Sequence, residues 1–353
     1  MPPLIIPIFV AHQGCPQRCI FCSEERSVGA GPESITAAYL EETVAAYLKG
    51  SRRKRGPVQI AFYGGNFTGL DRARQRELLE MTDKFIKEGR VESIRISTRP
   101  DYIDGEGLDF LSRFSVRTVE IGVQSLRDEV LSLSGRGHKA TDVVQAVELL
   151  KSRGFETGVH LMVGLPGDSP AGFTHTVRQT IALSPHTVRI HPTLVFAGTG
   201  LADKLAAGDY QPLSMAEAIS ACKQALSEFT AAGIPVIRLG LQTTPAMEAP
   251  GNIVAGPYHP SFRSLVEEAI FFDLATRLLD RLNVQGGEAT CYLSPADLSS
   301  FRGPRNRNLQ AIKDKLSLSS LAITVDPQQP RGCLTMAAAG KTRQMAMADL
   351  CGA

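Results

Sequence analysis

The chain contains no tryptophan, and its charges nearly balance, with 38 lysine and arginine residues against 36 aspartate and glutamate residues. The formal net charge of +2 therefore gives no overall field that would demand a nucleic-acid partner. No apolar run reaches membrane-spanning length, and the first residues lack the basic start of a signal peptide. Of the seven cysteines, the four at positions 222, 291, 333 and 351 show no paired spacing, which argues against a disulfide framework and indicates a reducing, cytoplasmic environment.

Three of the cysteines, Cys15, Cys19 and Cys22, form a C-x3-C-x2-C motif directly after an apolar segment at residues 4–10. Cysteine thiolates are the usual ligands of iron–sulfur clusters, which most often take four. Three ligands from one loop would leave one iron of a four-iron cluster open to a small molecule. A zinc site with His12 as fourth ligand, and three unrelated thiols, are the alternatives.

Strand-like apolar segments alternate with helical patterns through most of the chain. Strands are expected at residues 4–10, 58–63, 93–98, 117–123, 157–163 and 187–194, and helices at residues 35–48, 71–89, 141–153, 170–183 and 215–232. This order predicts parallel strands joined by right-handed crossovers. A barrel and a doubly wound sheet both fit it, and both carry functional residues after the carboxyl ends of their strands.

The character of the sequence changes after Gln242. Residues 243–260 are rich in proline and glycine and predict a loop, and residues 261–282 predict an amphipathic helix. Further strands are expected at residues 318–325 and 333–338. We therefore predict one domain at residues 1–245 and a smaller C-terminal α+β accessory region at residues 246–353.

Glycine and polar residues stand where several of the expected strands end. Such residues are common in turns, but the carboxyl ends of parallel strands share one edge of a sheet. The residues that we expect to meet there are Gly64, Gly65 and Asn66 after the second strand, Ser97 on the third, Gln124 on the fourth and Leu165 after the fifth.

The cysteine spacing, with Phe21 just before the third cysteine, resembles the radical S-adenosylmethionine (radical SAM) superfamily. This resemblance implies a partial, six-stranded (β/α) TIM-like barrel and a 4Fe–4S cluster on Cys15, Cys19 and Cys22. In that family the reduced cluster cleaves S-adenosylmethionine (SAM) to a 5′-deoxyadenosyl radical, which abstracts hydrogen from a substrate. The resemblance also implies an electron donor such as a ferredoxin or a flavodoxin.

The same resemblance suggests residues that bind the cofactor. Gly64, Gly65 and Asn66 match the GGE or GGT segment that binds the methionine amino group, although Asn66 carries no charge. Gln124 and Arg136 keep the separation of the glutamine and arginine that contact the cofactor in oxygen-independent coproporphyrinogen oxidases. The remaining residues of the expected set are Ser97, which could contact the ribose, together with Phe21 and Leu165.

Other segments resemble the catalytic subunit of the elongator complex. They are TRPDY at residues 98–102, HLM followed by LP at residues 160–166, and HPTLVFAGTGL at residues 191–201, where Ala197 replaces an arginine of that family. The acetyltransferase turn of that subunit, R/Q-x-x-G-x-G/A, does not occur after Gln242. The full elongator reaction is therefore not expected from this polypeptide alone.

These resemblances imply a radical SAM enzyme with transfer RNA as one candidate substrate. The basic run RRKR at residues 52–55 could contact RNA phosphates, although a solvated turn explains it equally well. One alternative is a relative of coproporphyrinogen oxidase that acts on a porphyrin or another small molecule. The other is a non-catalytic iron–sulfur or haem-binding protein, which only the uncharged Asn66 favours.

Overall fold

The computed structural model describes residues 3–10, 13–16, 18–23, 26, 35–50, 56–284 and 286–351. Its contacts divide the chain into two compact units, Met1–Pro212 with Gln242–Pro257 and Leu213–Leu241 with Tyr258–Ala353. This division differs from the expected boundary between residues 245 and 246, because residues 213–241 group with the C-terminal part of the chain. No described helix is both long enough and apolar enough to cross a membrane.

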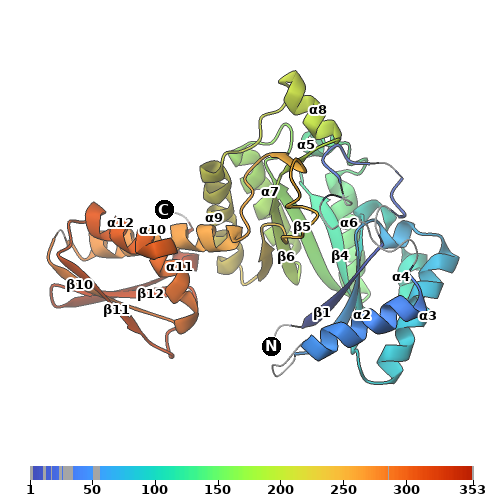
Figure 1. Cartoon of the computed structure of the whole chain (residues 1–353), viewed down its shortest axis with the longest axis horizontal. Helices are drawn as coiled ribbons and strands as arrows, with labels where there is room; N and C mark the ends of the chain where they lie inside the picture. Colours follow the sequence, from blue (N-terminus) through green and yellow to red (C-terminus); the bar gives the residue numbers. More distant parts are fainter. Residues whose placement is uncertain are drawn as a thin grey trace. The chain divides into compact units, whose positions relative to one another are not determined.

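A parallel sheet forms the centre of the first unit (Figure 1). Its strands in this unit are, in spatial order, β1 (Leu4–Phe9), β2 (Val58–Tyr63), β3 (Ser93–Thr98), β4 (Val116–Gln124), β5 (Glu156–Val163) and β6 (Thr187–Pro192). Each strand pairs in parallel with the next along the chain. The six expected strands are therefore present, and the predicted partial α/β barrel is confirmed.

Helices connect these strands. They are α2 (Ala37–Gly50), α3 (Arg72–Lys87), α4 (Gly105–Leu111), α5 (Asp128–Leu133), α6 (Ala140–Ser152) and α7 (Pro170–Leu183), and α8 (Gly200–Ala207) follows the last of these strands. Asp71 caps α3 by accepting a hydrogen bond of 2.8 Å from the backbone N–H of Arg74. The sequence pattern did not indicate α4, α5 and α8, because each has eight residues or fewer and lacks a full amphipathic repeat.

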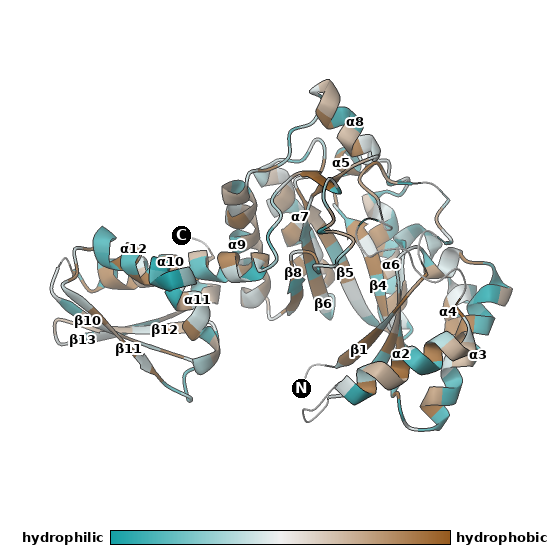
Figure 2. Ribbon diagram, in the orientation of Figure 1, coloured by the Kyte–Doolittle hydropathy of each residue, from teal (hydrophilic) through white to brown (hydrophobic). Residues whose placement is uncertain are grey.

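The two faces of the sheet differ in chemistry. Ile60, Ile94 and Ile121 are fully buried on the helix-covered face, where removing apolar surface from water stabilises the fold. The helix α3 accordingly shows both brown and teal segments in Figure 2, as an amphipathic helix does. Side chains alternate between the two faces along each strand, so the residues directly before and after each of these isoleucines point to the opposite, inner face.

The second unit combines helices with a four-stranded sheet. Its elements are α9 (Met215–Ala231), β8 (Val236–Leu239), α10 (Phe262–Arg281), β10 (Glu288–Leu293), α11 (Leu298–Arg302), α12 (Arg307–Lys315), β11 (Ser320–Val325), β12 (Cys333–Ala338) and β13 (Lys341–Ala346). The strand order is β11-β10-β12-β13, and α10 packs on this sheet. The expected helix and both expected strands of this region are present, while β10 and β13 were not predicted.

Candidate active site

The three motif cysteines lie in the loop after β1, and their exposure differs. Cys19 is buried, Cys15 is exposed, and Cys22 lies between these extremes. A backbone hydrogen bond of 3.0 Å from Cys22 N to Cys19 O closes the turn that joins them. Among the described residues, no three His, Cys, Asp or Glu side chains are gathered closely enough to hold a metal ion.

Arg136 reaches this loop from the segment between α5 and α6. Its Nη1 donates a hydrogen bond of 3.3 Å to the Sγ of Cys19, and its Nη2 donates to the carbonyl oxygen of Gly122. The side chain is buried, and its Nε has no hydrogen-bond partner among the described residues. A positively charged side chain whose Nε lacks a partner thus lies against a predicted ligand sulfur.

Arg99, which follows β3, brings a second cation to the same loop. It forms a bidentate ion pair with Asp101, with distances of 2.9 Å and 2.7 Å. Burial opposes its charge, but Asp101 and the nearby sulfurs of Cys19 and Cys15 together raise the pKa of Arg99. Its Nη1 is buried without a partner in the described part of the chain. An anionic group bound at the loop would satisfy this donor and the Nε of Arg136, so the residues fit a negatively charged cofactor.

Asn66 is fully buried and braces the loop. Its Oδ1 accepts hydrogen bonds from the Thr98 hydroxyl at 2.5 Å and from the backbone N–H of Arg99 at 3.1 Å. Its Nδ2 donates to the carbonyl oxygen of Gly14 at 2.9 Å. The amide therefore ties the cysteine loop to the end of β3, while a direct contact with a cofactor stays a prediction.

Gly65 explains why glycine follows β2. Its backbone has a φ of 110°, and a Cβ atom there would lie 2.7 Å from the carbonyl oxygen of Gln13 and 2.8 Å from that of Val10. A side chain at this position would push the β2 loop away from the cysteine loop. Gly65, with Gly64 beside it, thus permits the close approach of two backbones, whether or not it also contacts a cofactor.

Gln124 and Arg136, expected from the sequence to act together, converge in the structure. A Cβ built on Gly122 would lie 3.0 Å from the Nε2 of Gln124 and 3.1 Å from the Nη2 of Arg136. Gln124 has a left-handed backbone with a φ of 65°, next to an irregularity in the pairing of β4 with β5. Ser97 is partly exposed on β3 and shares the inner face of the sheet with this pair.

Phe21 and Leu165 are both in largely apolar surroundings. Phe21 packs against a cluster of Val195, Leu201 and Tyr210. The Tyr210 hydroxyl donates a hydrogen bond of 2.7 Å to the carbonyl oxygen of the residue before Leu165, and Leu165 itself is buried. Tyr210 thus connects the cysteine loop, through its cluster with Phe21, to the end of β5 through this hydrogen bond.

Two features near Arg136 and on the inner face were missed from the sequence. The first is His138, which is buried; burial and the Arg136 cation lower its pKa to about 3, so its ring is neutral near pH 7. A single histidine in a sequence gives little indication of a functional role. Its position two residues after Arg136, a predicted cofactor residue, was the available indication.

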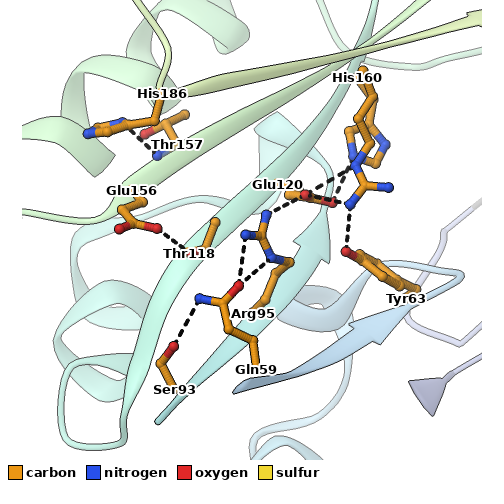
Figure 3. Close-up of polar contacts among 11 residues, drawn as sticks. Gln59, Tyr63, Ser93, Arg95, Thr118, Glu120, Glu156, Thr157, His160 and His186 are labelled. Atoms are coloured by element: carbon orange, nitrogen blue, oxygen red, sulfur yellow. Dashed lines mark hydrogen bonds and ion pairs between the residues drawn. The ribbon is translucent and has the colours of Figure 1, made fainter. Parts of the chain in front are cut away.

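The second feature is a charged network centred on Glu120, whose side chain is 0% exposed (Figure 3). Its Oε1 accepts from Arg95 Nη1 at 2.5 Å and from Arg189 Nη2 at 3.0 Å, and its Oε2 lies 2.9 Å from His160 Nε2. Arg189 Nη2 also donates to the Tyr63 hydroxyl at 2.7 Å. Burial would raise the pKa of Glu120, but His160, Arg189 and Arg95 outweigh it and hold that pKa well below its usual range.

A glycine in β5 makes room for this network. A Cβ on Gly158 would lie 2.8 Å from the Cγ of Glu120, the residue opposite it in the register of β4 and β5. Glycine inside a strand often marks a close approach of another group. Gly158, together with a glutamate in an apolar strand, was therefore the feature of the sequence that could have indicated this network.

Comparison with known proteins gives two matching family models and several relatives. The model described as the radical SAM superfamily matches residues 9–180, and the Radical_SAM C-terminal domain model matches residues 185–271. A tRNA uridine(34) acetyltransferase of Methanocaldococcus infernus is 28% identical over 261 residues, which cover 63% of this chain and 49% of that protein. The oxygen-independent coproporphyrinogen-III oxidase-like protein HemZ of Bacillus subtilis is 25% identical over 201 residues, which cover 54% of this chain and 39% of that protein.

A solved structure resembles the chain in fold. The archaeal Elp3 of Methanocaldococcus infernus, with residues 1–46 deleted, superposes with a TM-score of 0.56 at 21% identity, covering 79% of this chain and 63% of that chain. At this identity the likeness concerns the fold alone. The chain spans about half the length, or less, of these two curated relatives.

Proposed function

Because this chain belongs to the radical SAM superfamily, whose cofactors are a 4Fe–4S cluster and SAM, we propose that it is an enzyme of radical chemistry. Cys15, Cys19 and Cys22 would hold the cluster, and Arg136 would bind the carboxylate of SAM. When bound, the reduced cluster supplies the electron that splits a sulfur–carbon bond of SAM. The contact of Arg136 with Cys19 carries this proposal, because it joins a predicted ligand to a predicted cofactor residue.

The other residues of the site would orient and shield the cofactor. Arg99 Nη1 and Arg136 Nε are buried donors suited to an anionic group. Phe21, packed on Leu201 and Tyr210, would keep water from the loop, which matters because a reactive radical must be protected from solvent. We propose a ferredoxin or a flavodoxin as the electron donor.

Arg136→Ala is expected to weaken SAM binding about 10- to 100-fold, because it removes a charge-assisted hydrogen bond to a carboxylate. The measurement is the dissociation constant of SAM for anaerobically reconstituted protein, together with the release of 5′-deoxyadenosine after reduction with dithionite. The iron content should stay that of the native chain.

The matched control is Arg113→Ala, which removes an arginine that is exposed on the same unit. This variant should bind SAM as the native chain does. Equal SAM affinity in Arg136→Ala and the native chain would remove Arg136 from the site.

For the substrate, we propose transfer RNA. The tRNA uridine(34) acetyltransferase similar to this chain supports it, and the similarity to HemZ supports a small molecule as the second candidate. The basic run at residues 52–55, which suggested phosphate contacts, lies outside the described residues.

Bulk transfer RNA should bind at low salt, and its affinity should fall roughly a hundredfold when the salt concentration rises fourfold, if about four phosphates are neutralised. Alanine at all four positions 52–55 should weaken the binding at low salt and flatten its salt dependence. Filter binding at two salt concentrations measures both effects. If the native chain does not bind at low salt, or the variant binds equally well, the small-molecule substrate replaces RNA.

A further inference from the structure

The inner face of the sheet holds more positive than negative charge around Glu120. One carboxylate, Glu120, contacts two guanidinium groups, those of Arg95 and Arg189. Guanidinium groups stay protonated in proteins, and the pKa of Glu120 lies well below its usual range, so these three side chains sum to one positive charge. Moving charges out of water is costly, and a buried ion pair often adds little to stability. Buried charged groups with perturbed pKa values are common at functional sites, so this network is a candidate functional site.

One part of the network, formed by Arg95, Gln59 and Ser93, is enclosed by the protein. Arg95 is 5% exposed, and each of its three nitrogens has a partner: Nε and Nη2 donate to Gln59 Oε1 at 3.2 Å and 2.9 Å, and Nη1 donates to Glu120. Gln59 Nε2 in turn donates to the Ser93 hydroxyl at 3.0 Å (Figure 3). Arg95 can therefore position its neighbours, and its burial keeps it away from a ligand.

The other part of the network, formed by Arg189 and Tyr63, has hydrogen-bond donors that remain available to a ligand. Arg189 is 14% exposed and uses Nε and Nη2 on Glu120 and Tyr63, while Nη1 makes no hydrogen bond or ion pair with the described residues and is not among the buried atoms that lack a partner. The Tyr63 hydroxyl accepts from Arg189 and is therefore left with its own hydrogen to donate. Burial raises the pKa of Tyr63, so the hydroxyl stays protonated. The Arg189 guanidinium also lies 5.3 Å from the centre of the Tyr63 ring, which fixes the two groups against each other.

We propose that Arg189 and Tyr63 form an oxyanion-binding site, which anchors a carboxylate or phosphate group of the substrate; this inference rests on the function proposed above. Glu120 and Arg95 position Arg189 for this role. The Nη1 of Arg189 has two N–H groups to donate to an oxygen of either group. A cationic ligand does not fit, because the Glu120 carboxylate is fully buried and already paired with Arg95, His160 and Arg189.

The site lies close to the candidate cofactor residues along the same strand. Glu120 and Gly122 are two positions apart on β4, a distance of about 7 Å, and Gly122 O accepts a hydrogen bond from Arg136. His160, which contacts Glu120, pairs in register with both Gly122 and Arg189. A substrate held by Arg189 would therefore lie beside a cofactor held by Arg136.

The test is a calorimetric titration of the reconstituted, SAM-saturated chain with inorganic pyrophosphate and, separately, with succinate. SAM is added so that the probes do not bind at Arg136 or Arg99. At least one probe should bind saturably, and Arg189→Gln should weaken it tenfold or more, roughly the value of one charge-assisted hydrogen bond. Tyr63→Phe should weaken it about threefold, as expected for a neutral donor, and Arg189→Lys should restore part of the loss. Preference for pyrophosphate or succinate identifies the oxyanion as phosphate or carboxylate.

The control is Arg117→Gln, an exposed arginine on β4, which should leave the titration unchanged. Absence of binding of both probes to the native chain would overturn the inference. So would equal affinities of the native chain and the Arg189→Gln and Tyr63→Phe variants, since the probes would then bind elsewhere. Cleavage of SAM by the native chain is assayed separately: if it fails while Arg189-dependent binding holds, the proposed function is wrong and the site stands.

Discussion

Replacing Cys15, Cys19 and Cys22 together with alanine is expected to abolish iron binding, because the remaining cysteines are too scattered to replace a three-thiolate loop. The native chain, reconstituted without oxygen, should take up about four irons and show broad visible absorption that dithionite bleaches. The triple variant should bind almost none and should release no 5′-deoxyadenosine from SAM. Iron analysis and absorption spectra before and after reduction measure this.

The control is a double variant, Cys333→Ala with Cys351→Ala, which removes two thiols of the second unit. It should keep the full complement of iron and the bleachable spectrum. Retention of the native iron content by the triple variant would contradict the ligand assignment and reopen the zinc or unrelated-thiol interpretations of the motif.

The second large effect is expected for Glu120→Ala, which should reduce the free energy of unfolding by about 3–5 kcal/mol. The variant leaves the buried Arg95, and Arg189 beside it, without the carboxylate that neutralises them. Denaturant unfolding at pH 7, followed by circular dichroism, measures this loss. Since the folded-state pKa of Glu120 is lowered, its contribution should be fully present above the ordinary glutamate pKa and should fall as the pH drops below it.

Glu156→Ala provides the matched control on the next strand. Glu156 is exposed and accepts one hydrogen bond, from the Thr118 hydroxyl at 2.7 Å. Its removal should cost about 1 kcal/mol or less. Similar losses in the two variants would show that the Glu120 network adds nothing beyond an ordinary surface contact.

The parts of the fold that could be predicted depend on long local patterns. The apolar runs that became β1 to β6 and the amphipathic repeat that became α10 each span enough residues to show a period. The short helices α4 and α5 do not, and β13 is mostly exposed and polar, so it lacks the alternation of a half-buried strand.

The candidate site was predictable where spacing along the chain carries the chemistry. The cysteine motif and the separation of Gln124 from Arg136 are of this kind, and the structure brings Gln124 and Arg136 together at Gly122. Glu120 was not predicted to act at a site, because its partners come from other strands. A charged residue in a strand normally indicates solvent exposure, and only the assembled sheet shows that Glu120 is enclosed.

Because Asn66 carries an amide, the hydrogen bonds that tie the cysteine loop to β3 do not depend on pH. A glutamate at this position would bind a proton in mildly acidic solution, and its bonds to Thr98 and to the backbone of Arg99 would then change in strength. An amide neither gains nor loses a proton across that range, so the bonds to Gly14, Thr98 and Arg99 keep the same donors and acceptors. The anchoring of the loop to β3 should consequently be as firm in acid as at neutral pH, even where the charge pairs elsewhere on the sheet weaken.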